Sequence, residues 1–165
     1  MKVNTLRFGE LDIEETQIFT FPMGILGFSS MKDFVIIEQE DQHPFKWLQS
    51  IEDPSTAFVL SDPLLFYPTY CAEIKRSELS MLGEIQDEDL VLSVIMTVPE
   101  DAKNLSANLC APLIFNLVNR TGMQYVLNDP RYPVKYFLFH EDTSSPFIQV
   151  DSNESSSESR SLSLR

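Results

Sequence analysis

Short apolar runs, repeatedly interrupted by proline, are the feature that most limits how this chain can fold. Residues 34–38, 45–50 and 56–61 are each too short for a long helix, and they are rich in β-branched residues or alternate apolar with polar side chains. Asp-Pro pairs at 53–54 and 62–63 break the chain between such runs. Many short strands with frequent turns predict an all-β fold, either an antiparallel sandwich or a partly open barrel.

The most apolar strand is predicted over residues 90–98, whose two faces are both largely apolar. Such a strand belongs in the middle of a sheet, where both faces are covered. Residues 111–119 and 123–127 form the best hairpin in the chain, with a turn at 121–122. Pro112 donates no ladder hydrogen bond, so it indicates a bulge or an edge that would be open to strand addition.

The sequence predicts one short helix, over residues 77–83, where a serine can cap the start and a glycine can end the helix. Near His140 the composition changes, and the chain becomes serine-rich with few large apolar groups. A segment of that composition cannot offset its own ordering entropy. We therefore expect a single β-barrel-like domain over residues 1–140 and a flexible serine-rich tail over residues 141–165.

The charge of the chain is strongly negative, because 12 basic and 25 acidic residues give a formal net charge of −13. A surface of this kind repels phosphate backbones, so direct nucleic-acid binding is not expected, whereas basic partners are attracted. Solubility alone is the competing explanation of the acidity. The sequence contains no apolar run of the roughly 18 residues that span a membrane and no secretory signal, so we expect a cytoplasmic protein without membrane contact.

Residue types that carry out catalysis are sparse in this chain. His43 and His140 have no companions at the spacing of a zinc site or a catalytic triad, and Cys71 and Cys110 have no activating neighbours in sequence. The sequence also contains no phosphate-binding loop and no dinucleotide-binding fingerprint. We therefore expect no enzyme, no cofactor and no metal site. A small-ligand or flavin-binding barrel is the alternative from a different functional class.

Residues 21–28, FPMGILGF, form the segment most suited to binding another molecule. Proline fixes φ and glycine opens the positive-φ region, so the backbone here follows a tight path that a rigid scaffold can present as a shaped surface. Met23, Ile25 and Leu26 are the preferred exposed anchors, and the flanking phenylalanines are expected to plug the loop. Three asparagines beside apolar segments either tie loops to the sheet or contact a partner. The predicted partner-binding residues are Phe21, Met23, Gly24, Ile25, Leu26, Gly27, Phe28, Asn104, Asn108 and Asn116.

Four motifs in order give the chain a family resemblance over residues 1–139. They are FPMGILGF at 21–28, PFKWLQS at 44–50, the segment 98–116 that begins VP and ends NLSANLCAPLIFN, and GMQYVL at 122–127 with the following Tyr-Pro pair. Together these motifs resemble the FliW family of bacterial flagellar assembly factors. The serine-rich tail has no counterpart in the resemblance.

The resemblance implies a protein that binds flagellin in the cytoplasm and also binds CsrA, the RNA-binding translational repressor. It implies that flagellin occupies the protein until export, and that the freed protein then captures CsrA and relieves repression of flagellin synthesis. The residues themselves, without the resemblance, indicate only an acidic β scaffold that presents a glycine-rich loop. A flagellin chaperone without a regulatory role is a further alternative.

Overall fold

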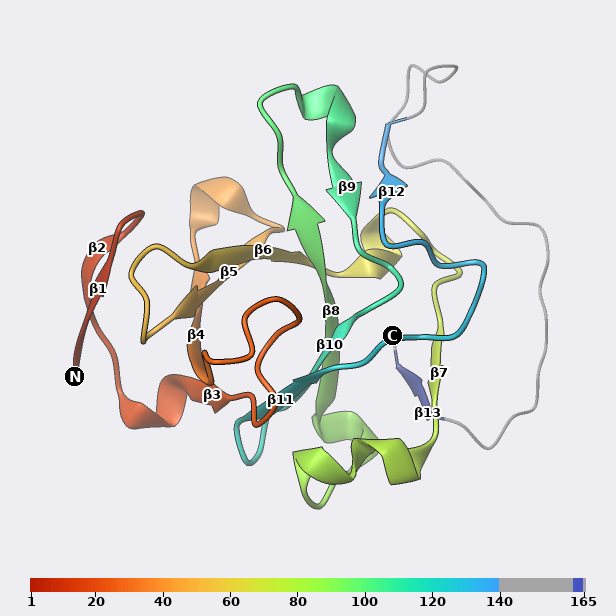
Figure 1. The fold of residues 1–165 in the computed structure, drawn as a ribbon, viewed down its shortest axis with the longest axis horizontal. Coiled ribbons are helices and arrows are strands. Elements are labelled where there is room, and N and C mark those ends of the chain that lie inside the picture. Colours follow the sequence, from red (N-terminus) through yellow and green to blue (C-terminus); the bar gives the residue numbers. More distant parts are fainter. Residues whose placement is uncertain (140–161, 165) are drawn as a thin grey trace.

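The computed structural model describes residues 1–139 and the backbone of residues 162–164. Seven strands form a closed ring, in which each strand pairs with the next and the last returns to the first (Figure 1). In ring order, these strands are β3 (Ile18–Thr20), β4 (Asp33–Glu38), β5 (Lys46–Ser50), β6 (Ala57–Ser61), β8 (Leu90–Thr97), β10 (Leu113–Asn116) and β11 (Thr121–Gln124).

Neighbouring strands of the ring are antiparallel except at one place. There β11 runs parallel to β3, and the two strands meet at a single residue pair, Thr121 with Thr20. The long strand β8 pairs with β6 and β10 and is therefore central, as its two apolar faces predict. The predicted all-β barrel is thus confirmed, with the refinement that the barrel is closed and that one pairing is parallel.

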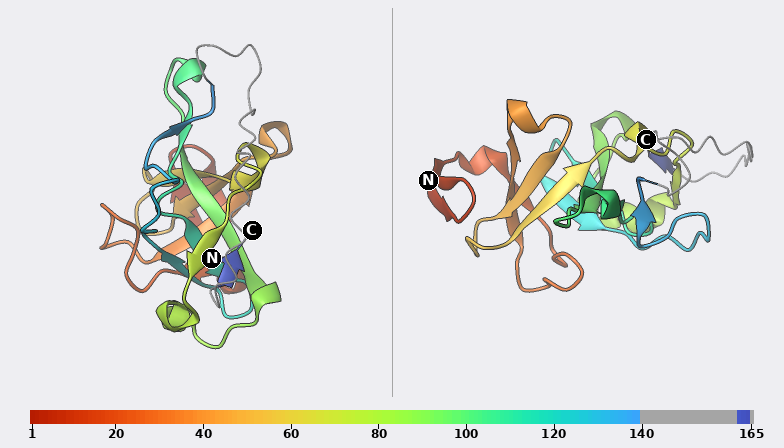
Figure 2. Two further views of the ribbon diagram at one scale, coloured as in Figure 1. Left: turned by 90° about the vertical axis from the view of Figure 1, so that its right-hand side faces the viewer. Right: turned by 90° about the horizontal axis from the view of Figure 1, so that it is seen from above.

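The remaining elements surround the ring. They are β1 (Lys2–Thr5), β2 (Gly9–Asp12), β7 (Ala72–Ile74), β9 (Ser106–Ala107), β12 (Tyr136–Phe137), β13 (Leu162–Leu164) and the 3-10 helices η1 (Glu15–Gln17), η2 (Glu40–Gln42), η3 (Pro63–Leu65), η4 (Arg76–Leu82), η5 (Asp87–Asp89) and η6 (Ala102–Asn104). The hairpin β1–β2 lies at one end of the molecule, and the pair β7–β13 lies toward the other (Figures 1 and 2).

Phenylalanine side chains fill the inside of the ring, because alternate residues of each strand point inward. Phe19 packs edge-to-face on Phe115 with ring centroids 5.2 Å apart. Phe21 packs in the same way against Phe34, at 5.4 Å, and against Phe115, at 5.6 Å. This arrangement is the favoured one for aromatic pairs and adds stability beyond the buried area. Leu48, Leu60 and Leu113 complete the interior cluster.

Two further apolar clusters lie on the outside of the ring. Hairpin β1–β2 covers β4 through a small cluster centred on Val3, Ile13 and Val35. The larger cluster joins the outward residues of β8 to η4, β7 and the segment that follows β11, and it includes Leu79, Leu92 and Tyr132. Apolar layers therefore cover the barrel on two sides, and the layer formed by the larger cluster contains more buried residues.

Several local predictions differ from the structure. The hairpin turn lies at residues 117–120, before Thr121, because Gly122 is part of β11. Pro112 precedes β10, which pairs with β8 on one side and β11 on the other, so the expected free edge is absent there. The expected short helix is present as η4, but it is 3-10, and its N-cap residue is Lys75 with no side-chain cap.

Gly83 ends η4 with a φ of 77°, as the sequence predicts. The predicted final strand, over residues 132–139, is reduced to β12, because only two residues pair with β9. The predicted flexible tail falls mostly outside the described residues, and its described part is β13. No helix within the described residues has the length and apolar character needed to cross a membrane.

Candidate functional site

The loop formed by residues 21–28 is anchored by its first side chain. Phe21 is fully buried inside the ring, and its backbone N–H donates to the carbonyl oxygen of Lys32 at 2.7 Å. A Cβ on Gly122 would lie 2.3 Å from the Cζ atom of Phe21. The ring of Phe21 therefore occupies the space that a side chain at position 122 would need, which explains a glycine within strand β11.

The two glycines of the loop form its turns. Gly24 and Gly27 have φ values of 67° and 84°, in the region that favours glycine. A Cβ on Gly24 would also lie 2.8 Å from the carbonyl oxygen of Phe28, so the chain folds back tightly on itself. The N–H of Phe28 donates to the carbonyl oxygen of Ile25 at 2.7 Å. The loop is thus a fixed shape held by its own backbone, as its composition predicts.

The loop presents two strongly exposed apolar side chains. Met23 is 68% exposed and Leu26 is 62% exposed, so their expected exposure is confirmed, and their role as anchors stays a prediction. Ile25 is only 2% exposed, so its expected exposure is wrong: it belongs to the interior cluster. Phe28 was expected to plug the loop, but it is 37% exposed and packs edge-to-face on Phe58 at 5.0 Å.

Polar contacts fix the loop to the neighbouring strand. The Oε1 atom of Gln124 accepts the N–H of Leu26 at 2.9 Å, and the Nε2 atom of the same side chain donates to the carbonyl oxygen of Ala111 at 3.0 Å. Gln124 therefore links the loop to the segment that leads into β10. Three of the predicted site residues in the loop, Phe21, Gly24 and Ile25, are buried and support the loop without facing solvent.

The three asparagines predicted for the site lie apart from the loop in sequence and have different environments. Asn116 is fully buried, and its Nδ2 atom donates to the carbonyl oxygens of Leu82 and Glu84 at 3.0 and 3.1 Å. It therefore ties the end of η4 to the barrel and has no surface to offer a partner. Asn108 is half-buried, and its Oδ1 atom accepts the N–H of Ala111 at 3.0 Å, whereas Asn104 is exposed at the end of η6.

A concave surface that was not predicted from the sequence lies over three strands, and we call it the β5–β6–β8 groove. It has a volume of about 810 Å³ and lies on the outer side of these three strands. The register sets Trp47 opposite Val59 and Val59 opposite Met96, so one row of outward side chains crosses the three strands. Phe45 and Leu105 also line the groove. The signal was present in sequence as the Phe45-x-Trp47 alternation, but strand pairing was needed to extend it to Val59 and Met96.

Trp47 is held in place at one end of the groove. Its Nε1 atom donates to the Oε1 atom of Gln42 at 2.6 Å, and the guanidinium of Arg7 lies 4.2 Å from the centre of its ring. The ring of Phe8 meets it edge-on at 5.6 Å. These contacts come from η2 and from the turn between β1 and β2, so the hairpin at the N-terminus helps to shape the groove.

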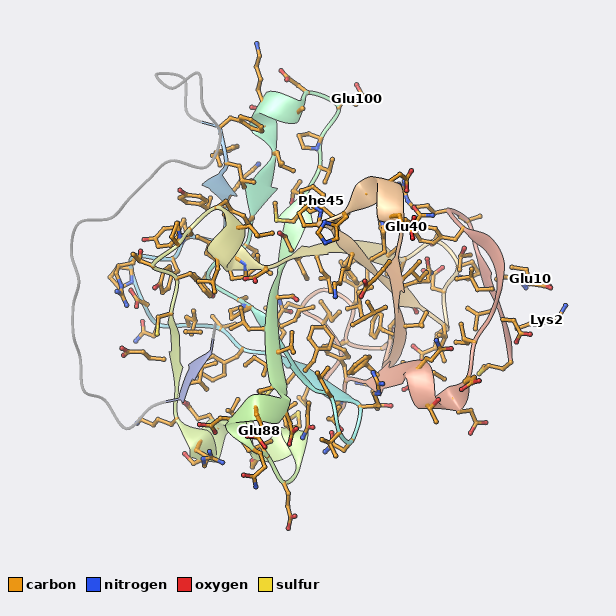
Figure 3. The ribbon with its side chains drawn as sticks, turned by 180° about the vertical axis from the view of Figure 1, so that it is seen from behind. Lys2, Glu10, Glu40, Phe45, Glu88 and Glu100 are labelled. Carbon is orange, nitrogen blue, oxygen red and sulfur yellow. The ribbon has the colours of Figure 1, made fainter. Side chains whose placement is uncertain are left out.

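The lining of the groove holds one acidic side chain, Asp41, and one basic side chain, Arg7, and further acidic side chains lie nearby. Asp41 lies next to Glu40 on η2, and Glu100 and Asp101 lie on the projecting arm between β8 and β9. In Figure 3, Phe45 lies between Glu40 and the arm that carries Glu100. An apolar floor between acidic flanks suits an amphipathic segment that carries basic residues.

The groove and the loop share one residue. Phe58 lines the groove, and the ring of Phe28 from the loop packs on it. The Phe58 side chain is opposite Leu48 and packs on the interior cluster, so its contact with Phe28 lies on the inner face of β6. The next residue, Val59, points outward into the groove, so β6 separates the two surfaces.

The largest shift of a tyrosine pKa among the described residues belongs to a buried pair of rings. Burial raises the pKa of Tyr70 and of Tyr132, whose rings pack 4.5 Å apart in the outer cluster. The Tyr70 hydroxyl donates to the carbonyl oxygen of Leu109 at 2.8 Å, and the Tyr132 hydroxyl accepts the N–H of Cys71 at 2.9 Å. Both hydroxyls thus tie loops together. Within the described residues, no group of three or more His, Cys, Asp or Glu side chains is placed to hold a metal ion.

Comparisons with known proteins identify the family. The model of the FliW protein family matches residues 2–138. A flagellar assembly factor FliW of Caldicellulosiruptor saccharolyticus is 43% identical over 138 residues, which cover 84% of this chain and 90% of that protein. Another, of Alkaliphilus metalliredigens, is 38% identical over 157 residues, covering 94% and 95%. A crystal structure of the flagellar assembly factor FliW matches with a TM-score of 0.79 and 36% identity, over 87% of this chain and 100% of that one. The chain therefore belongs to the FliW family of flagellar assembly factors.

Proposed function

We propose that this protein binds flagellin and the translational repressor CsrA in the cytoplasm, and that its capture of CsrA relieves repression of flagellin synthesis. The observation that carries the proposal is the family match, which spans almost the whole described barrel. A flagellar assembly factor acts through contacts with other proteins and not through catalysis. The fixed apolar loop and the β5–β6–β8 groove supply surfaces for such contacts.

The groove is the surface that we assign to flagellin. Terminal segments of flagellin that form amphipathic helices have apolar side chains at i, i+3 and i+4, and a groove of about 810 Å³ accommodates a few of them. Met23 and Leu26 on the loop of residues 21–28 offer a second exposed apolar surface. Rigid exposed apolar anchors of this kind are typical of residues that dominate a binding energy.

The acidic surface is the feature that we assign to CsrA. A net charge of −13 attracts a basic RNA-binding protein and repels its RNA, so binding to the acidic surface opposes RNA binding by the same partner. Mutual exclusion of flagellin and CsrA then comes from overlap of their sites or from coupling between separate sites.

Variants of the exposed anchors test this assignment. Met23→Asp and Leu26→Asp each place a charge where an apolar contact forms, so we expect at least a tenfold loss of affinity for one of the two partners with an unchanged circular dichroism spectrum. Val134→Asp is the matched control, because Val134 is 65% exposed and is neither in the loop nor in the lining of the groove. Equal binding of both partners by all three variants would contradict the assignment of the loop.

Val98→Asp tests the groove in the same way. Val98 lines the groove and is strongly exposed, so its replacement disturbs no buried packing. We expect weaker flagellin binding, measured by isothermal titration calorimetry, with the stability of the protein retained. Loss of flagellin binding with intact CsrA binding would separate the two sites. A protein that binds flagellin normally but never binds CsrA would instead be a chaperone without a regulatory role.

A further inference from the structure

Strand β7 has an unusual position in the fold, because it pairs with no strand of the barrel. Its ladder partner is β13, and the two strands form a separate two-stranded sheet. Figure 1 shows β13 beside β7 at the side of the barrel away from the N-terminal hairpin. The described strand β7 therefore owes its pairing to the last few residues of the chain.

The register of this pair follows the burial of β7. Leu162 is opposite Ile74 and Leu164 is opposite Ala72, and both of these β7 residues are fully buried. Ser163 is opposite Glu73, which is exposed. Directly opposed residues in an antiparallel pair share one face of the sheet. The alternation of leucine and serine in the C-terminal segment thus matches the alternation of buried and exposed positions in β7.

The pairing is short and is made by a distant part of the chain. Strand β13 has three residues, fewer than the five or so of an average strand. Residues 140–161 separate it from the described body, so the pairing also carries the entropy cost of closing a loop of about twenty residues. A segment held by so few ladder bonds at that cost can exchange with another strand of similar sequence.

We propose that the edge of β7 is a strand-accepting site, which the C-terminal segment of this chain occupies and which an extended segment of a partner protein can take over. Such a segment adds to the edge by main-chain hydrogen bonds and carries apolar residues at alternate positions. In the sequence, Arg160 and Arg165 flank the self-segment in an otherwise acidic chain. The partner segment is therefore extended, basic at its flanks and apolar at every second residue.

This proposal is independent of flagellin and CsrA and concerns a different surface. The β5–β6–β8 groove includes no residue of β7, and neither does the loop of residues 21–28. The C-terminal segment of this chain also lies beyond residues 2–138, which the family model matches. In this protein the C-terminal segment therefore competes with a partner segment for the edge of β7.

The test uses the full chain and two prolines. In the double variant Leu162→Pro/Ser163→Pro, two neighbouring backbone N–H groups are lost, and because neighbouring groups point to opposite sides of a strand, one of them faces β7. Ser155→Pro/Ser156→Pro is the matched control, with the same two changes elsewhere in the C-terminal segment. Hydrogen exchange at residues 72–74 should be at least tenfold faster in the first variant than in the control and the unmodified chain.

A labelled peptide with the sequence of residues 159–165, SRSLSLR, completes the test. By fluorescence anisotropy it should bind the Leu162→Pro/Ser163→Pro variant at least tenfold more tightly than the unmodified chain. A peptide of the same composition and charge with the order SRLLSSR should bind the variant at least tenfold more weakly than SRSLSLR. Unchanged exchange at β7, equal binding to variant and unmodified chain, or equal binding of the two peptides would each overturn the proposal.

Discussion

The substitution Gly122→Ala tests how the ring interior holds the loop of residues 21–28. The new Cβ would lie 2.3, 2.5 and 2.8 Å from three carbon atoms of the Phe21 ring, whereas carbon atoms in contact are normally about 3.5–4.0 Å apart. The ring cannot simply turn away, because it is fully buried and packs against Phe34 and Phe115. Overpacking of a filled core costs about 1–3 kcal/mol, and we expect the upper end here.

A second substitution separates this clash from any other effect of alanine. Phe21→Leu alone removes part of a buried ring, and because Phe→Ala costs about 3–5 kcal/mol, the milder change should cost roughly 1–2 kcal/mol. Leucine also vacates the place where the new Cβ lies. The double variant Phe21→Leu/Gly122→Ala should therefore be more stable than the sum of the single changes by about 2 kcal/mol, a coupling typical of residues in contact.

Urea unfolding followed by the fluorescence of Trp47, the one tryptophan in the chain, measures all four proteins. Gly27→Ala is the control: its φ of 84° makes alanine unfavourable by about 1–2 kcal/mol, but no atom lies within 4 Å of the new Cβ. We expect no coupling between Gly27→Ala and Phe21→Leu. If Gly122→Ala and Phe21→Leu were strictly additive, the contact that anchors the loop would not exist as described.

Three further predictions concern buried polar groups. Burial raises the pKa of Tyr70, so above pH 10 the unfolded chain loses this proton first, and the free energy of unfolding falls by up to about 1.4 kcal/mol per pH unit. Below pH 10 this contribution to stability is fully present. In Tyr70→Phe the free energy of unfolding should fall less steeply with rising pH than in the unmodified chain. An identical dependence on pH in urea unfolding at pH 8–11 would contradict this. The Nε2 atom of buried Gln49 faces the carbonyl oxygens of Ser50 and Thr56, at 2.9 and 3.1 Å, so Gln49→Glu should lower the thermal midpoint more than the uncharged Gln49→Met does. Asn116→Ala should cost about 2–3 kcal/mol in urea unfolding, because it leaves buried carbonyl oxygens without donors, and a loss below 0.5 kcal/mol would show that η4 is held in another way.

Strand content and the central position of β8 were predictable, because both depend on local sequence. An apolar run of alternating character between turn residues is enough to indicate a strand, and a run that is apolar on both faces indicates a central one. Closure of the barrel was not predictable in this way, since it depends on one residue pair between β11 and β3, far apart in sequence. The hairpin turn was misplaced because Gly122 was interpreted as a turn residue, whereas it makes room for Phe21.

The candidate site was only partly predictable for the same reason. The fixed shape of the loop and the exposure of Met23 and Leu26 follow from its glycines and its apolar residues. The burial of Ile25 depends on the ring beneath it, which no local pattern describes. The groove arises only when β5, β6 and β8 are placed side by side. Strand addition was assigned to Pro112, but the edge that accepts a strand in this structure is β7, whose three residues were too few to stand out in sequence.

A competition titration tests the central claim most directly. CsrA from the same organism is first bound to this protein, and flagellin is then added while the amount of complex is followed by gel filtration and calorimetry. The account predicts a stable complex with each partner alone, and a CsrA affinity that falls at least tenfold when flagellin is bound. No measurable heat and no complex with either partner would contradict the account.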